Sequence, residues 1–306
     1  MRAVHHTTEG IQVVDAPEPS GGGTTIRVAA AGICGSDLHM LSFGAFPFTL
    51  GHEVGGVLED GTPVAMWPAR PCGECDRCLA GETTQCRTGM SSIYGSTGGD
   101  GGMADAVRVE DRCVIPLPAG VSPGDASLVE PIACSVHAMR SHVLTGDRVA
   151  VIGAGSIGLG AAAVARWLDA SVDVTARHAH QRAAAAAIGA GIEPSGEYDV
   201  VVEAAGTSGA IESAFQFVRP GGTVVFVSSH WEPVQFPMFF TGKEPRMVTA
   251  MTHQRRDMED AAQLLADLPE VPAALITHRL PLDRAADAFR IAADRAAGAI
   301  KVVLEP

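Results

Sequence analysis

A thiolate, an imidazole and a carboxylate are offered between residues 34 and 53 by Cys34, His52 and Glu53. These are the donor types that a catalytic Zn²⁺ takes when it keeps one position open for water or substrate. Each residue alone is more often structural, since a lone Cys is commonly a small buried hydrophobic side chain. Their closeness in the sequence favours a metal site that performs chemistry.

Two neighbours of Cys34 could move a proton. Ser36 offers a hydroxyl and His39 an imidazole, and general acid–base catalysis needs a group that titrates near neutral pH. Asp37 could fix the tautomer of a ligating histidine by accepting its second N–H. We therefore predict Ser36 and His39, together with Glu53, as catalytic residues.

Four of the seven cysteines lie in one loop, at Cys72, Cys75, Cys78 and Cys86. Their spacing, in a polar and glycine-bearing loop, is typical of a closed tetrahedral zinc site of the structural kind. Metal binding would order a loop that has too little apolar content to fold unaided. We predict a structural zinc here, and core packing for Cys113 and Cys134.

Length and composition limit the classes of protein. The 306 residues, 46% hydrophobic and 19% charged, suffice for two globular domains. A net charge of −13 argues against nucleic acid or an anionic membrane as the main partner. Seven cysteines, an odd number, and a start without a signal-peptide pattern favour metal binding in a reducing compartment. We expect a cytoplasmic protein that binds neither nucleic acid nor membrane.

Short strands separated by turns dominate the first third of the chain. Segments rich in β-formers at residues 11–14 and 25–29 are followed by strand candidates at 54–58, 63–67 and 104–109. Proline, glycine and polar residues break them apart. This pattern is typical of an irregular, mainly β domain.

From residue 146 the pattern changes to α/β. A buried strand at 147–152 is followed directly by a glycine-rich turn and an alanine-rich helix to about residue 168, then a second strand at 172–175. The glycines permit a tight turn, close approach of a pyrophosphate and close packing of helix on strand. We predict coenzyme contacts at Gly153, Gly155, Ser156, Ile157 and Gly158.

Two more buried strands of the parallel type are expected at 198–204 and 223–228, with a helix near 210–217 between them. The loops after these strands contain Gly206 and Ser228 and leave the carboxyl edge of the sheet, where dinucleotides bind. We predict both residues as coenzyme contacts. Further elements are expected at 258–268 (helix), 276–282 (strand), 285–293 (helix) and 300–304 (strand).

Together these motifs resemble the zinc-containing medium-chain alcohol and polyol dehydrogenases, of the sorbitol and threonine dehydrogenase type. Members carry Gly-x-Cys-Gly-Ser/Thr-Asp-x-His, as at residues 32–39, Gly-His-Glu-x-x-Gly, as at 51–56, and a four-cysteine lobe. The resemblance implies an α/β fold, with a doubly wound Rossmann sheet beside a mainly β, GroES-like catalytic domain. The implied division is 1–138 (catalytic), 139–268 (Rossmann) and 269–306, a segment that completes the first domain.

The resemblance also implies a role for Glu130, in Val129-Glu130-Pro131. Polyol-type members have a Glu-Pro there, and that Glu lies at the catalytic metal as a direct or water-bridged ligand. The structural alternative is a carboxylate at the start of a helix. The spacing leaves open whether Glu53, Glu130 or both bind the metal.

The choice of coenzyme depends on the end of the second strand, where an acid binds the 2′-hydroxyl of NAD. Aligned on Ile188-Gly189-Ala190, which related sequences share, that position is Ala176, followed by Arg177. A small residue and a guanidinium suit the 2′-phosphate of NADP. The alternative is a solvated Arg177 and an enzyme that is indifferent to the phosphate. We favour NADP(H), with zinc as the other cofactor.

The expected function is a zinc-dependent alcohol or polyol dehydrogenase, or a carbonyl reductase in the reverse direction. The alternative is a zinc-stapled, dinucleotide-binding regulatory or structural protein without turnover. The family implies a small-molecule substrate and a homodimer or homotetramer. The loop between Cys34 and His52 is short for the family, and apolar candidates for the pocket are Phe43, Phe46, Phe48, Tyr94 and Trp231.

Overall fold

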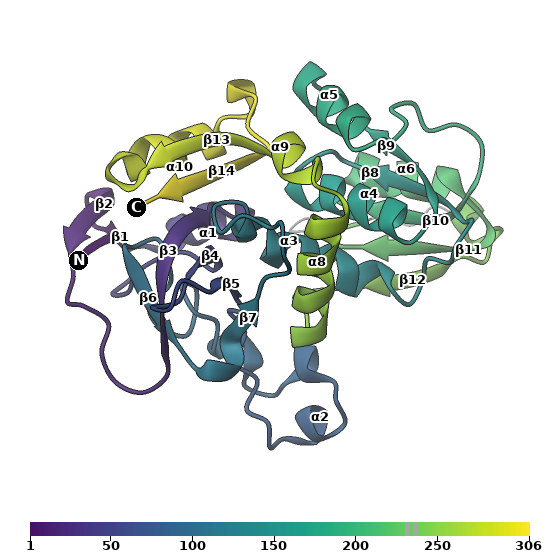
Figure 1. Cartoon of the computed structure of the whole chain (residues 1–306). Helices are drawn as coiled ribbons and strands as arrows, with labels where there is room; N and C mark the ends of the chain where they lie inside the picture. The colour runs from purple at the N-terminus through teal and green to yellow at the C-terminus, as the bar shows by residue number, and fades with distance from the viewer. Residues whose placement is uncertain (230–232, 235–237) are drawn as a thin grey trace. The chain divides into compact units, whose positions relative to one another are not determined.

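The computed structural model describes residues 1–229, 233–234 and 238–306 (Figure 1), so Trp231 lies outside the described residues. The chain forms two compact units. The first consists of Met1–Glu130, Gln254–Ala266 and Ile276–Pro306, and the second of Pro131–His253 and Asp267–Leu275. The predicted domain boundaries after residues 138 and 268 stay a prediction. In the structure the first change of unit falls inside helix α3 (Val129–Met139).

The first unit is built on a seven-stranded sheet, which confirms the mainly β prediction. The strand order is β13-β14-β3-β4-β5-β7, and β6 pairs with β3. The strands are β3 (Thr24–Gly32), β4 (Glu53–Val57), β5 (Pro63–Met66), β6 (Ala106–Val109), β7 (Val114–Pro116), β13 (Ile276–Pro281) and β14 (Lys301–Glu305). The helices are α1 (Gly35–Met40), α2 (Asp76–Leu79), α10 (Ala285–Ala293) and nearly all of α8 (Arg255–Asp267).

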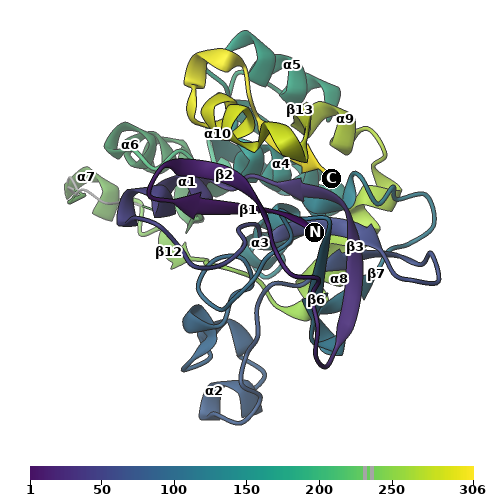
Figure 2. The same ribbon diagram turned by 90° about the vertical axis from the view of Figure 1, so that its left-hand side faces the viewer.

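A strand at the start of the chain was not predicted. Strand β1 (Arg2–Thr7) pairs antiparallel with β2 (Gly10–Asp15) to form a separate hairpin. Its sequence contains two adjacent histidines and no apolar run, so the strand depends on its pairing with β2 more than on its own composition. Figure 2 shows this hairpin, together with β3 lying beside β6.

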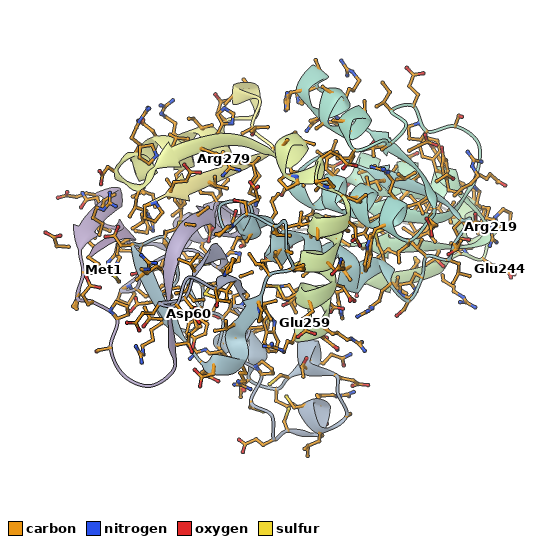
Figure 3. The ribbon with its side chains drawn as sticks, viewed as in Figure 1. Met1, Asp60, Arg219, Glu244, Glu259 and Arg279 are labelled. Carbon is orange, nitrogen blue, oxygen red and sulfur yellow. The ribbon has the colours of Figure 1, made fainter. Side chains whose placement is uncertain are left out.

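The C-terminal tail is part of the first unit. Strand β14 pairs antiparallel with the end of β3, and on its other side β3 pairs with β4, with Gly32 opposite Glu53. Arg279 of β13, labelled in Figure 3, forms ion pairs with Asp125 and Glu305. The end of β3, the start of β4 and the start of β14 therefore meet in one part of the sheet.

The second unit is a five-stranded parallel sheet in the order β12-β11-β10-β8-β9. Its strands are β8 (Arg148–Ile152), β9 (Ser171–Thr175), β10 (Tyr198–Glu203), β11 (Val218–Phe226) and β12 (Arg246–Thr249). Its helices besides α3 are α4 (Ser156–Trp167), α5 (Ala179–Ala187), α6 (Ser208–Phe217), α7 (Met238–Thr241) and α9 (Val271–Leu275). The chain winds outward from β8 in both directions, which confirms the predicted doubly wound sheet.

Runs of valine explain why the second unit forms a parallel sheet. Val200, Val201 and Val202 of β10 are all buried, as expected for a strand covered on both faces. Within the described residues, no helix is both long enough and apolar enough to cross a membrane.

Candidate functional site

The end of β3 and the start of β4 bring the three predicted metal ligands together. Cys34 follows β3 directly before α1, and His52 directly precedes β4. One donor atom from each of Cys34, His52 and Glu53 lies within 4.8 Å of the other two. His52 and Glu53 are only 6% and 0% exposed. The pairing of β3 with β4 thus brings Cys34 close to His52 and Glu53, although they are far apart in the sequence.

Asp37 links the two segments that carry these ligands. Its Oδ2 accepts the backbone N–H of Cys34 at 2.8 Å, and its Oδ1 lies 3.4 Å from Nδ1 of His52. With Nδ1 turned towards this carboxylate, Nε2 is the nitrogen available to a metal, and it lies 3.4 Å from Oγ of Ser36. A carboxylate in this position fixes the orientation of a ligating histidine.

The electrostatic field at His52 favours a positive charge. Burial lowers the pKa of the imidazole, but the negative charge of Asp37, the charge of the Cys34 sulfur and hydrogen bonds to both outweigh burial and raise the pKa well above its usual value. Sulfur and nitrogen donors in a buried, electronegative setting suit Zn²⁺. The residues present therefore fit the predicted catalytic metal.

Glu53 has a partner that no sequence pattern predicted. Nζ of Lys301 lies 2.7 Å from each carboxylate oxygen of Glu53 and donates to the carbonyl of Ile33 at 3.0 Å. Burial raises the pKa of Glu53, and the charge of Lys301 opposes that rise without cancelling it. Gly32 makes room for the pair, because a Cβ there would lie 2.1 Å from Oε2 of Glu53.

Glu130 is outside the group of close donor atoms that Cys34, His52 and Glu53 form among the described residues. It lies in the first turn of α3. The pKa of Glu53 and that of Lys301 depend first on burial and then on the charge of the other member of the pair. The negative charge of Glu130 is a smaller effect that raises both pKa values. Its part in binding a metal stays a prediction.

The predicted proton-transfer residues Ser36 and His39 lie on α1 and are exposed. The ring of His39 packs edge-on against Phe43, with 5.1 Å between ring centroids. Phe46 and Phe48 pack against each other at 5.3 Å. The short segment after α1 therefore carries three of the five predicted apolar candidates, Phe43, Phe46 and Phe48.

Tyr94, predicted as an apolar pocket residue, has a structural role in the first unit. The residue is 8% exposed, and its hydroxyl accepts the N–H of Glu110 at 3.0 Å. The guanidinium of Arg70 lies 4.4 Å from the centre of its ring. Partners far away in the sequence therefore hold this side chain in place, and its part in a substrate pocket stays a prediction.

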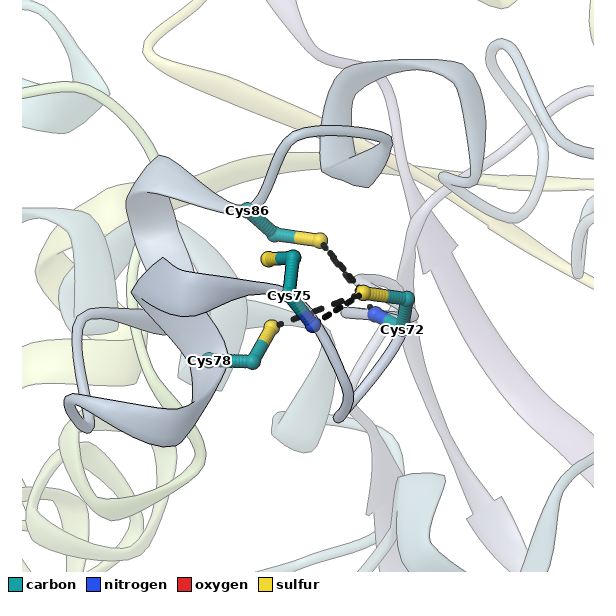
Figure 4. Close-up of side chains that lie close together, drawn as sticks. All are labelled: Cys72, Cys75, Cys78 and Cys86. Carbon is teal, nitrogen blue, oxygen red and sulfur yellow. Dashed lines mark hydrogen bonds between the residues drawn. The ribbon is translucent and has the colours of Figure 1, made fainter.

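The four cysteines of the predicted structural site converge in the lobe around α2 (Figure 4), with their sulfur atoms within 4.8 Å of one another. Sγ of Cys72 lies 3.6 Å from Sγ of Cys86 and 3.9 Å from Sγ of Cys78. Two backbone N–H groups point at sulfur, from Cys72 to Cys86 at 3.2 Å and from Cys75 to Cys72 at 3.4 Å. This arrangement fits a tetrahedral zinc bound by four thiolates.

The thiols of this lobe differ in acidity. The N–H of Cys72 lowers the pKa of Cys86 to about 6, whereas desolvation raises the pKa of Cys78 to about 12. The four thiols therefore do not all ionise at neutral pH by themselves. A bound Zn²⁺ deprotonates its thiol ligands outright, so we expect the order of the lobe to depend on the metal.

Replacing Cys78 with serine is expected to release one zinc per chain and to unfold the lobe locally, since three thiolates hold the metal more weakly. The Tm should fall by only about 5 °C, because the core of the unit stays intact. Elemental analysis and calorimetry measure the two effects. The matched control is Cys113→Ala, a buried cysteine of the same unit, which should keep its zinc. Full zinc content in Cys78→Ser would contradict the site.

The glycine-rich turn follows β8 and opens α4, as predicted. Gly153 has a φ of +109°, which glycine adopts without strain. A Cβ on Gly158 would lie 1.9 Å from the carbonyl oxygen of Gly153, whereas a Cβ on Gly155 would meet nothing within 4 Å. The turn is therefore tight on the side of the sheet and open around Gly155. Ser156 and Ile157 form the first turn of α4.

The end of β9 has the features predicted for coenzyme discrimination. Thr175, its last residue, accepts the N–H of Gly153 at 2.9 Å, and Ala176 and the exposed Arg177 follow. Arg182 holds this loop by donating to the carbonyls of Ala176 at 3.2 Å and Arg177 at 2.9 Å. The loop after β9 thus carries an exposed guanidinium and no acid.

A cavity of about 680 Å³ lies in the second unit, beyond the carboxyl ends of β11 and β12. Its walls are mainly apolar and include Ile157 and Ser228. Cys134 also lines it, so the prediction that this cysteine packs in the core is wrong. A ring nitrogen of His253, which was not predicted, lies within 4.8 Å of the Cys134 sulfur. Apolar walls with a few hydroxyls suit a flat heteroaromatic ring.

Known proteins resemble both parts of the chain. A family model described as alcohol dehydrogenase GroES-like domain matches residues 20–119, and one described as zinc-binding dehydrogenase matches residues 156–267. L-galactonate-5-dehydrogenase of Escherichia coli K12 is 31% identical, over 89% of this chain and 88% of the relative.

Solved structures resemble the whole chain. One from Sinorhizobium meliloti 1021, described as a zinc-binding dehydrogenase bound to NADP, has a TM-score of 0.85 at 29% identity and covers 100% of this chain and 99% of its own. Another, an alcohol dehydrogenase from Escherichia coli CFT073 complexed with NADH, has a TM-score of 0.87 at 25% identity and the same coverage of 100% and 99%.

Proposed function

Because this chain belongs to the zinc-containing medium-chain alcohol and polyol dehydrogenases, we propose that it exchanges a hydride between NADP(H) and an alcohol or polyol, or the corresponding carbonyl compound. Membership follows from the two family models and from a relative 31% identical over 88% of its length. It confirms the resemblance predicted from the motifs, and with it an oxidoreductase. The alternative of a protein without turnover receives no support from these relatives.

The observation that carries this proposal is the convergence of Cys34 and His52 with an orienting carboxylate, Asp37. A zinc ion held by these two ligands and a carboxylate, from Glu53 or Glu130, would supply a Lewis acid for the substrate oxygen. The chain keeps the His52 ring turned and the site buried, so that charges inside it interact through little water.

Ser36 and His39 are proposed to carry the proton that leaves the substrate hydroxyl. Oγ of Ser36 lies 3.4 Å from Nε2 of His52, beside the proposed metal ligand. Ser36 and His39 are both exposed on α1, so a proton taken up by either can pass to solvent.

The second unit is proposed to bind the coenzyme, whose nicotinamide accepts or donates the hydride. The turn from Gly153 to Gly158 and the start of α4 would bind the pyrophosphate. Gly206 and Ser228 lie in the loops at the carboxyl edge of the sheet. The apolar cavity that Ile157 and Ser228 line suits the nicotinamide ring.

The solved relatives include one bound to NADP and one complexed with NADH, so they do not decide the coenzyme. The preference for NADP(H) that we propose is supported by Arg177, which follows β9 and is exposed. The wild type is expected to show a higher kcat/KM with NADPH than with NADH. In Arg177→Asp the ratio of the two kcat/KM values should fall by about a hundredfold, so that NADH is preferred. Steady-state kinetics with both coenzymes measure it. Arg177→Lys, which keeps the charge without the bidentate fork, should retain part of the preference. A wild type that prefers NADH would refute the idea.

We also propose a homodimer or homotetramer in the cytoplasm, by analogy with the family. Strand β12 is an edge of the parallel sheet, and an edge strand has backbone groups that can pair with a second copy of the chain. Light scattering of the purified protein measures the mass.

The proposed function is tested with a panel of sugars, polyols, secondary alcohols and their ketones, assayed with both coenzymes on protein of measured zinc content. We expect about two zinc ions per chain and turnover of at least one class of compound. One zinc per chain and no turnover across the panel would overturn the proposal.

A further inference from the structure

The buried carboxylate of Glu203 ties together the two loops that leave the carboxyl edge of the parallel sheet. Glu203 is the last residue of β10 and is 0% exposed. Its Oε1 accepts the backbone N–H groups of Ala205 and Gly206, each at 2.9 Å. Its Oε2 accepts the hydroxyl of Ser228, which follows β11. One side chain thus receives three hydrogen bonds from two loops.

The first of these loops also packs on the glycine-rich turn. A Cβ on Gly153 would lie 2.9 Å from Cβ of Ala205, so the loop and the turn are in close contact. Gly206 has a φ of +69°, and Thr207 then caps α6 by accepting the N–H of Ala210 at 3.3 Å. The second loop borders the cavity, because Ser228 lines it. The three hydrogen bonds therefore fix the relative positions of the turn and the cavity wall.

We propose that Glu203 is a positioning residue for the coenzyme: it holds the loops after β10 and β11 in the conformation that binds the dinucleotide. This inference rests on the coenzyme site proposed above. A loop that is already ordered loses less conformational entropy when a ligand binds. Without the carboxylate, the amides of residues 205 and 206 and the Ser228 hydroxyl would lose their common acceptor. Binding of the coenzyme would then have to order the loops, and the cost in conformational entropy would weaken the affinity.

Two conservative variants separate the length of this side chain from its charge. In Glu203→Gln the amide oxygen can accept both backbone N–H groups, and the amide NH₂ can donate to the Ser228 hydroxyl, so all three contacts persist. In Glu203→Asp the charge stays, but the side chain is one methylene shorter and cannot reach both loops. A positioning role requires the length and tolerates loss of the charge.

The experiment is a fluorescence titration of the zinc-loaded protein with NADPH and with NADH. We expect Glu203→Gln to bind within about threefold of the wild type, and Glu203→Asp and Glu203→Ala to bind about tenfold more weakly. The KM for the coenzyme should rise in parallel. The kcat at saturating coenzyme should stay close to that of the wild type, since no metal ligand is changed.

The matched control is Asp199→Asn, at the opposite end of the same strand. Asp199 accepts the N–H of Arg148 at 2.9 Å and a guanidinium N–H of Arg219, labelled in Figure 3, at 2.7 Å. This variant should lower the Tm and leave the Kd for the coenzyme unchanged.

The outcomes distinguish this inference from the coenzyme site on which it rests. A wild type that binds neither coenzyme would remove the proposed site itself. Equal binding by the wild type, Glu203→Asp and Glu203→Ala would remove only the positioning role. Weak binding by Glu203→Gln would also overturn it, because charge and not length would then be responsible.

Discussion

Replacing Cys34 with alanine is expected to lower kcat/KM for alcohol oxidation by about a thousandfold, because a Lewis acid contributes several kcal/mol to stabilising the charge that develops on the substrate oxygen. The variant should also lose one zinc per chain while the four-cysteine lobe keeps the other. The fold should persist, since Cys34 is part of a loop and only partly buried. Zinc content, circular dichroism and steady-state kinetics, measured on one preparation, separate these effects.

A second variant is expected to weaken metal binding without abolishing it. Asp37→Asn keeps the shape of the side chain that lies 3.4 Å from His52 but removes its charge, and we expect about a 10- to 100-fold loss in metal affinity. Added zinc should restore activity to Asp37→Asn and not to Cys34→Ala. The buried Cys113→Ala serves as the control for changing a cysteine of the same unit. Wild-type turnover by zinc-depleted Cys34→Ala would show that the metal at this site has no part in the reaction.

The parts of this site that could be predicted from the sequence are those built by local patterns. The four cysteines between residues 72 and 86 and the turn from Gly153 to Gly158 each lie in one short segment, where spacing alone limits the geometry. The short valine-rich runs of β8 and β10 likewise identify strands of the parallel sheet from local sequence alone. The structure differs from these predictions by only a few residues at the ends of elements.

The parts that could not be predicted depend on contacts between distant segments. Lys301 lies 248 positions from Glu53, and only the pairing of β14 with β3 brings it there. Glu203 looks like the polar end of a buried strand until the two loops that it joins are known. Cys134 shows the opposite error, since an apolar helix pattern does not reveal that this one side chain faces a cavity. Periodicity predicts burial and not the identity of a partner.

The buried pair of Lys301 and Glu53 leads to the second prediction with a large effect. Removing one partner of a buried ion pair leaves an uncompensated charge, which costs about 3–5 kcal/mol. We therefore expect Lys301→Met to lower the free energy of unfolding by that amount at pH 8, measured by urea denaturation. The double variant with Glu53→Gln should recover most of the loss, since neither charge then remains. Independent, additive losses in the double variant would contradict a direct interaction.

The pH dependence of Lys301→Met gives the same prediction a second readout. Burial already raises the pKa of Glu53, and loss of the opposing charge of Lys301 removes the main factor that lowers it. A carboxyl whose pKa is higher in the folded than in the unfolded state binds more protons when folded, so its stability falls as the pH rises from the unfolded pKa towards the folded one. The deficit of Lys301→Met relative to the wild type should therefore be smaller at pH 5.5 than at pH 8. A deficit that is independent of pH would mean that Glu53 is not the group left uncompensated.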